Sequence, residues 1–153
     1  MWRRGDYLIT TDRSRIDLEL VHRFLSEEAY WSRGVSRDVV ERSIRNSVNF
    51  VLLHGEEQVG FARVVTDYAT FAWLADVFVL PGHRGMGLGT CLVETAVSHP
   101  DLRGLRRWTL ATGDAHGLYA RFGFRQVAAG SRFMVIENAP AAEAIEPEFA
   151  HRD

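Results

Sequence analysis

The sequence predicts a mixed α/β (α+β) domain built on a mostly antiparallel sheet of about seven strands with about four helices. Three β-prone segments follow one another closely between residues 49 and 80, and their short connections favour an antiparallel meander. The apolar spacing then changes to the helical period, and a further strand follows that helix, which predicts one crossover connection. A chain of 153 residues fits one compact domain. We expect that domain to span 1–137, with 138–153 as a flexible tail or extension that lacks a strong apolar face.

The first third of the chain predicts one strand and two helices. The β-prone run Tyr7–Thr10 forms the strand. Ser14 is the expected N-cap of the first helix, with Asp17 three residues later in a position that resembles a capping box. Ser36 is the expected N-cap of the second helix. Apolar stripes follow each cap, at Leu18, Val21 and Leu25 and then at Val40, Ile44 and Val48.

The rest of the chain predicts a regular alternation of elements. The meander strands are expected at 49–53, 58–66 and 70–80, with turns at 54–57 and 67–69. A helix over 87–98, a strand over 107–112 and a short helix over 114–121 follow. Two last strands are expected at 124–127 and 132–136.

The connection between the third meander strand and the next helix carries the strongest functional signal. The segment Arg84-Gly85-Met86-Gly87-Leu88-Gly89 places three alternate glycines where a helix begins. Glycine allows positive φ and a close approach of a ligand to the backbone. The N–H groups at a helix start attract anions. The loop is therefore a candidate diphosphate site, and the alternative is a tight turn whose glycines serve packing alone.

Two nucleotide-binding motifs fit this loop poorly. A P-loop ends in Gly-Lys-Ser or Gly-Lys-Thr, whereas Gly89-Thr90-Cys91 lacks the lysine. A dinucleotide fingerprint has glycine at its sixth position, which is Thr90 when counted from Gly85. Its strand would also open a βαβ unit, whereas the strand here belongs to a meander.

The loop resembles the GNAT superfamily of N-acetyltransferases, whose pattern is Gln or Arg, two residues, Gly, one residue, and then Gly or Ala. The preceding Val79-Leu80-Pro81 is similar to the strand end of that family. Downstream, Leu118-Tyr119 followed by Gly123-Phe124 is similar to its second motif. The resemblance covers roughly residues 50–135. It implies a sheet splayed between its fourth and fifth strands, and direct transfer of an acetyl group to a primary amine of a small molecule or peptide.

The resemblance also implies acetyl-CoA as co-substrate, with the pyrophosphate on the glycine loop and the pantetheine arm along the end of the fourth strand. Thr112 stands where many relatives carry Asn, seven residues before the tyrosine of the second motif, and Asp114 or His116 are the alternatives for that contact. The implied cofactor-binding residues are Val77, Phe78, Val79, Arg84, Gly85, Met86, Gly87, Leu88, Gly89, Thr90 and Thr112.

Two residues are the candidates for catalysis. Tyr119 takes the position of the general acid by resemblance, and a phenol is a suitable donor to a thiolate of comparable basicity. Its alternative role is that of a core aromatic residue. Asp76 is a carboxylate in an otherwise apolar strand, so we expect it to serve as base or in substrate binding, or else to pair with an arginine or the backbone. By resemblance, the acceptor pocket is expected in the segment between the first two helices, which carries Glu27, Glu28, Tyr30 and Trp31 and favours a small cationic amine. The alternative for Glu27 and Glu28 is that of solvated surface charges.

Composition limits the remaining classes. A net charge of −2 argues against a nucleic-acid binder. One cysteine suits a reducing cytoplasm, and no apolar run has the length of a membrane span. No His-Glu-x-x-His or thiolate cluster predicts a metal site. We therefore expect a cytoplasmic enzyme without metal, nucleic acid or membrane, and a homodimer remains open. The alternative functions are a non-catalytic CoA sensor and an enzyme for another acyl-CoA.

Overall fold

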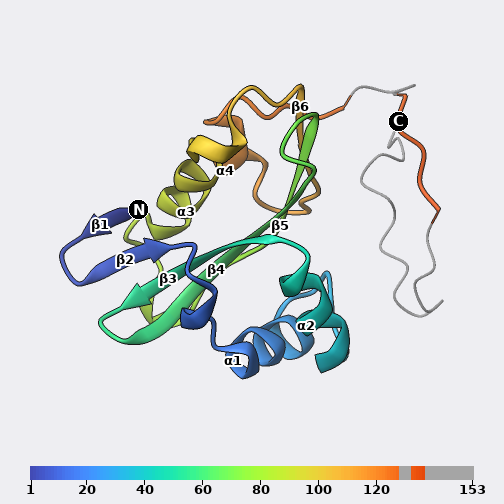
Figure 1. Cartoon of the computed structure of the whole chain (residues 1–153). Helices are drawn as coiled ribbons and strands as arrows, with labels where there is room; N and C mark the ends of the chain where they lie inside the picture. The colour runs from blue at the N-terminus through green and yellow to red at the C-terminus, as the bar shows by residue number, and fades with distance from the viewer. Residues whose placement is uncertain (128–131, 137–153) are drawn as a thin grey trace. The chain divides into compact units, whose positions relative to one another are not determined.

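The computed structural model describes residues 1–127 and 132–136, and the chain forms two compact units, 1–110 and 111–153. The first unit is built on a six-stranded sheet in the order β1-β2-β3-β4-β5-β6 (Figure 1). The strands are β1 Trp2–Arg4, β2 Tyr7–Thr10, β3 Val48–His54, β4 Glu57–Thr66, β5 Phe71–Val79 and β6 Arg107–Leu110. The helices of this unit are α1 Leu18–Arg23, α2 Arg37–Arg45 and α3 Leu88–Val97, with a π-helix η2 over Phe24–Glu28 and the 3-10 turns η1 Arg13–Arg15, η3 Pro81–His83 and η4 Pro100–Leu102.

The N-terminal region differs from the sequence prediction at two points. β1 was not predicted, and it forms a hairpin with β2 through a turn at Gly5, whose φ of 58° is in the left-handed region. The N-cap of α1 is Asp17 rather than Ser14, because the Asp17 carboxylate accepts from the Leu20 N–H at 3.0 Å. The Ser14 hydroxyl instead donates to Asp12 in the preceding 3-10 turn. The predicted cap of α2 is confirmed, since the Ser36 hydroxyl oxygen accepts from the Val39 N–H.

The two faces of the sheet are covered by different helices (Figure 1). On one face, α1, η2 and α2 pack around Phe61 of β4 and Phe78 of β5. Phe61 and Phe78 are register partners and therefore point to the same side. The other face is covered by α3, which lies against β3, β4 and β5. The buried side of α3 consists of Leu88, Leu92, Val93 and Ala96.

The meander and crossover are confirmed, and the last residues of β5 have no β6 partner. β4 pairs with β5 antiparallel, whereas β6 pairs with β5 parallel and only as far as Leu74. Beyond Leu74, β5 continues to Val79 with β4 as its strand partner. The register between Phe61 and Arg63 skips one residue of β5, which is a β-bulge, and Asp76 within it has a φ of 54°. The β5–β6 pairing thus stops before the end of β5, which is consistent with the predicted splay.

The second unit contains the short helix α4, His116–Ala120, as predicted. The two last predicted strands are wrong, because residues 124–127 and 132–136 belong to no helix or strand and have no sheet partner among the described residues. Alternating apolar residues form a strand only where the backbone hydrogen-bonds to a neighbouring strand. The side chains of Met134 and Ile136 are also 96% and 89% exposed. The sheet thus has six strands rather than about seven. The expected tail, 138–153, lies outside the described residues.

Candidate active site

The glycine loop between β5 and α3 is open to a ligand. Gly85 and Gly87 have φ values of 83° and 76°, and Gly87 is the N-cap of α3 without a side-chain hydrogen bond. A Cβ atom built on Gly85, Gly87 or Gly89 would meet no heavy atom within 4 Å. The first N–H groups of a helix have no intrahelical acceptor. The loop therefore offers backbone donors and empty space at the same place, which a merely tight packing turn does not need.

Two arginine side chains donate hydrogen bonds to backbone carbonyls at this loop. Arg84 donates from Nε to the Val79 carbonyl at 2.8 Å, so its side chain ties the loop to the end of β5. Arg4 of β1 donates from Nη2 to the carbonyl of Met86 at 2.7 Å, across 82 positions of sequence. The second contact was not predicted, because β1 itself was not. It brings a cation from the edge strand to the residue that lies between Gly85 and Gly87.

The predicted pantetheine strand is the end of β5 that has no β6 partner. Val77, Phe78 and Val79 lie after the last β5–β6 pair, on the part of β5 that pairs with β4. The Phe78 side chain is buried and stacks on Phe24, with ring centroids 3.9 Å apart. Phe78 thus reaches the core with its ring, and only its backbone can serve a ligand along the strand edge.

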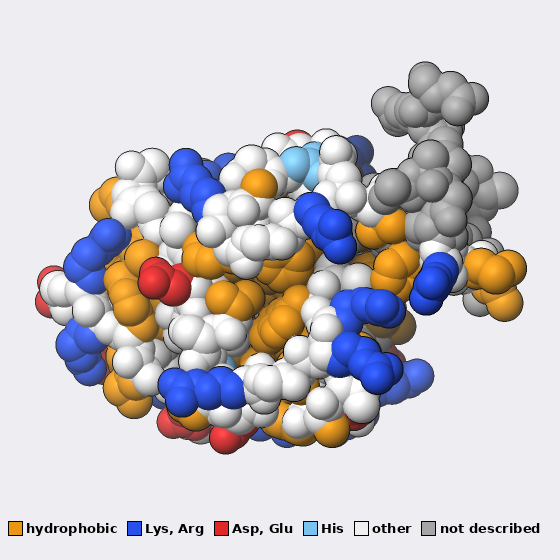
Figure 2. All heavy atoms as spheres, turned by 90° about the horizontal axis from the view of Figure 1, so that it is seen from above, with side chains coloured by type: hydrophobic (Ala, Val, Ile, Leu, Met, Phe, Trp, Pro, Cys, Tyr) orange, Lys and Arg blue, Asp and Glu red, His pale blue; other side chains and the backbone are white. Residues whose placement is uncertain are grey.

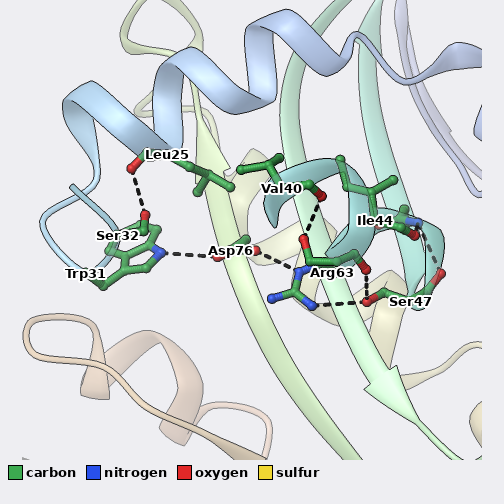
Figure 3. A network of polar contacts seen from close by, with 10 residues as sticks. Leu25, Trp31, Ser32, Val40, Ile44, Ser47, Arg63 and Asp76 are labelled. Carbon is green, nitrogen blue, oxygen red and sulfur yellow. Dashed lines mark hydrogen bonds and ion pairs between the residues drawn. The ribbon is translucent and has the colours of Figure 1, made fainter. Parts of the chain in front are cut away.

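Asp76 lies at the centre of a polar network (Figure 3). Its Oδ2 accepts from Arg63 Nε at 2.7 Å, and its Oδ1 accepts from Trp31 Nε1 at 3.2 Å. The side chains of Arg63 and Asp76 are 16% and 11% exposed, so the ion pair is largely withdrawn from water. Arg63 also donates from Nη1 to the hydroxyl of Ser47 at 3.0 Å. The pairing with an arginine is the alternative that the sequence left open for Asp76.

The four predicted acceptor residues lie in η2 and in the segment that follows it. Trp31 binds Asp76, and Tyr30 meets Trp31 edge to face with ring centroids 5.2 Å apart. Glu27 and Glu28 are exposed in η2. Glu28 lines a pocket of about 390 Å³ between the α1–η2 segment and η3, together with Leu20, Arg23, Phe24, Leu80, Pro81, Gly82 and His83.

Tyr119 and Thr112 belong to the second unit. Tyr119 lies in α4 and is half-buried, and its ring meets Phe124 edge to face with centroids 6.0 Å apart. Thr112 is buried, and its hydroxyl oxygen accepts from the Ala115 N–H at 3.0 Å. This bond holds the turn before α4, so the Thr112 hydroxyl already has a local structural partner.

Sequence reasoning left an arginine partner open for Asp76 but did not identify Arg63 or Trp31 as its partners. Arg63 is the second charge inside a buried strand of the meander, and an opposite charge in each of two neighbouring strands was the available signal. Ser47 and the Trp31 indole gave no such signal. Among the residues that the structure describes, no group of three potential metal ligands occurs, and no helix is long and apolar enough to cross a membrane.

The cations of this protein are all of one kind. Figure 2 shows blue side chains spread over one face of the molecule. The sequence contains 18 arginines and no lysine. Guanidinium groups stay charged and bind phosphate and carboxylate in a planar, two-pronged geometry. Such groups suit both the loop contact of Arg4 and the pairing of Arg63 with Asp76.

Comparison with known proteins points to one family. The family model for the acetyltransferase (GNAT) domain matches residues 45–126. A Gibberella zeae protein provisionally classed as an acetyltransferase is 32% identical over an alignment of 142 residues, and the match covers 78% of this chain and 79% of that protein. The crystal structure of a Xanthomonas campestris pv. campestris protein provisionally classed as a GNAT-family acetyltransferase is 46% identical, with a TM-score of 0.83 over 87% of this chain and 94% of that one. A GNAT-family acetyltransferase of Streptococcus pneumoniae shares the fold at 22% identity, with a TM-score of 0.67 over 88% and 98% of the two chains.

Proposed function

The chain belongs to the GNAT superfamily of acetyltransferases, and from that premise we propose that it transfers the acetyl group of acetyl-CoA directly to a primary amine of a small molecule or peptide. The observation that carries the proposal is the open glycine loop at the uncapped start of α3. We also propose that residues 1–137 act as one functional domain.

The residues of the loop fit the phosphates of acetyl-CoA. Side chains at Gly85, Gly87 and Gly89 would fill the space in which a diphosphate approaches the backbone. The N–H groups of Leu88, Gly89 and Thr90 begin α3, whose dipole favours an anion there. The edge of β5 from Val77 to Val79 has backbone groups for an extended ligand arm. When bound, acetyl-CoA supplies an activated acetyl group as a thioester.

The chain must also move protons during the reaction. A lysine-like amine with a pKa of about 10.4 costs roughly 4–5 kcal/mol to deprotonate at pH 7, so a proton acceptor near the amine speeds the reaction. We assign Tyr119 as the donor of a proton to the leaving sulfur, because a phenol hydroxyl has a matching basicity. We keep Thr112 as a weaker candidate for cofactor contact, since its hydroxyl oxygen accepts from Ala115.

Asp76 is assigned to the acceptor side of the site. Each carboxylate oxygen has two lone pairs, and one on each oxygen is used by Arg63 and by Trp31. The remaining lone pairs can accept a hydrogen bond from the incoming amine, directly or through water. The same carboxylate holds Trp31, so it also positions the aromatic residues Tyr30 and Trp31 beside the acceptor. Glu27 and Glu28 supply negative charge that favours a cationic acceptor.

The experiment measures acetyl-CoA binding by calorimetry and then release of CoA with a panel of amines and peptides. We expect acetyl-CoA to bind and to raise the melting temperature, because a ligand specific for the folded state stabilises it. At least one amine should release CoA faster than buffer alone. Absence of binding at millimolar concentration would refute the proposal. Binding without turnover on any amine would favour a CoA sensor, and turnover only with longer acyl-CoA would reassign the donor.

A further inference from the structure

The guanidinium of Arg4 lies at the glycine loop. Its Nη2 donates to the Met86 carbonyl at 2.7 Å, and its charged carbon lies 5.6 Å from the centre of the Trp2 ring. Among residues 1–127 and 132–136, no carboxylate forms an ion pair with it. The Met86 carbonyl accepts from one of the five N–H donors of this guanidinium.

The charge of Arg4 also acts on the first turn of α3. Burial raises the pKa of the Cys91 thiol, and the positive charge of Arg4 acts against that rise. Cys91 lies in the first turn of α3, and its N–H donates to the carbonyl of Gly87. Glu94 is the acidic residue of α3 whose charge is also felt at Cys91, and it lies one turn further along the helix.

We propose that Arg4 binds a phosphate group of coenzyme A, as a residue supplied by the N-terminal hairpin in addition to the glycine loop. This inference rests on the proposed function. The bond to Met86 holds the guanidinium beside the backbone donors before the ligand arrives, so the ordering cost is already met in the free protein. A guanidinium matches a phosphate in two parallel hydrogen bonds. Coenzyme A has a diphosphate and a separate 3′-phosphate, and either one presents the oxygens required.

The matched control is Arg3, which neighbours Arg4 in the same strand. Successive side chains of a strand point to opposite faces, so Arg3 lies on the other side of the hairpin from Arg4. Both residues are exposed, and their substitution changes the net charge equally. A difference between the two variants therefore reports position rather than total charge.

The experiment compares wild type, Arg4→Gln, Arg4→Lys and Arg3→Gln by calorimetry with acetyl-CoA and with dephospho-CoA, at about 50 mM and about 500 mM salt. We expect Arg4→Gln to weaken acetyl-CoA binding about five- to twentyfold at low salt, as for a charged hydrogen bond at an exposed site. The loss should shrink at high salt, Arg4→Lys should recover part of the affinity, and Arg3→Gln should bind as wild type. A loss that persists with dephospho-CoA assigns the contact to the diphosphate, and a loss that disappears assigns it to the 3′-phosphate.

Three outcomes would overturn the inference: equal affinity of wild type and Arg4→Gln, equal losses in Arg3→Gln and Arg4→Gln, or a loss of the same size at both salt concentrations. The last result would mark Arg4 as a structural tie between β1 and the loop, and the melting temperature of the free protein should then fall as well. Failure of wild type to bind acetyl-CoA would instead refute the proposed function, so the two failures are distinguishable.

Discussion

Replacement of Gly87 by valine separates the fold of the loop from its proposed function. Gly87 has a φ of 76° and a ψ of 15°, a left-handed conformation that costs an L-residue about 1–2 kcal/mol. A Cβ there meets no heavy atom within 4 Å, so no clash adds to that strain in the free protein. For a chain of this length, 1 kcal/mol corresponds to about 2–4 °C, so the melting temperature should fall by about 2–8 °C.

Gly104 provides a matched control for this strain. It has the same φ of 76° and the same open space, but it lies in the connection between η4 and β6. Gly104→Val should therefore lose about the same stability as Gly87→Val. If valine at Gly87 prevents folding, Gly87→Ala tests the same conformation with one carbon.

Ligand binding should distinguish the two variants. A ligand at 100 times its Kd stabilises the folded state by about 2.7 kcal/mol, which corresponds to about 5–11 °C here. Wild type and Gly104→Val should show this rise with acetyl-CoA, measured by scanning calorimetry. Gly87→Val should show little or none, because the side chain occupies the space for the phosphate. A folded Gly87→Val protein with wild-type affinity would refute the placement of the phosphates on this loop.

Three further predictions concern other residues. Tyr119→Phe keeps the ring, so CoA affinity measured by calorimetry should be unchanged. The kcat of steady-state acetylation should fall at least about tenfold, because the proton donor is lost. An unchanged kcat, with chemistry rate-limiting, would remove the hydroxyl from the mechanism. Asp76→Asn leaves the largely buried Arg63 unpaired, so denaturant unfolding should show a loss of about 1–3 kcal/mol, and an unaltered midpoint would contradict the importance of the pair. The pKa of Asp67 is lowered by the Thr70 hydroxyl and by backbone N–H groups. The stability it contributes is therefore present above the ordinary value of 3.8 and is lost as pH falls below it, so the melting-temperature gap between wild type and Asp67→Ala should close in acid; a constant gap down to pH 2 would contradict this.

Local signals in the sequence were sufficient for most of the fold. The cap at Ser36, the meander strands and the helix after the glycine loop each depend on residues close together in the chain, and all three were predicted. β1 was missed because Trp2–Arg4 has three residues and gains its structure from pairing with β2. The last two strands were predicted from alternation alone, which does not report whether a partner strand is present.

The site shows the same division between local and distant contacts. The glycine loop is contiguous in sequence and could be recognised from its residue types. The contacts of Asp76 with Arg63 and Trp31 depend on the bulge in β5 and on the α1–α2 connection, which join residues 13 and 45 positions apart. The contact of Arg4 with Met86 joins residues 82 positions apart and depends on β1, which was not predicted from the sequence. Such pairs follow from register, which one sequence does not fix.

The uniform use of arginine has a practical consequence for measuring this enzyme. An acetyltransferase commonly faces its own lysine side chains as competing amines, but the 153 residues of this chain contain no ε-amino group. A guanidinium stays protonated and is a poor nucleophile at neutral pH. Radiolabel from acetyl-CoA should therefore not accumulate on lysine in the protein itself. Label recovered in a supplied amine or peptide can then be read as intermolecular transfer, with little background from self-modification.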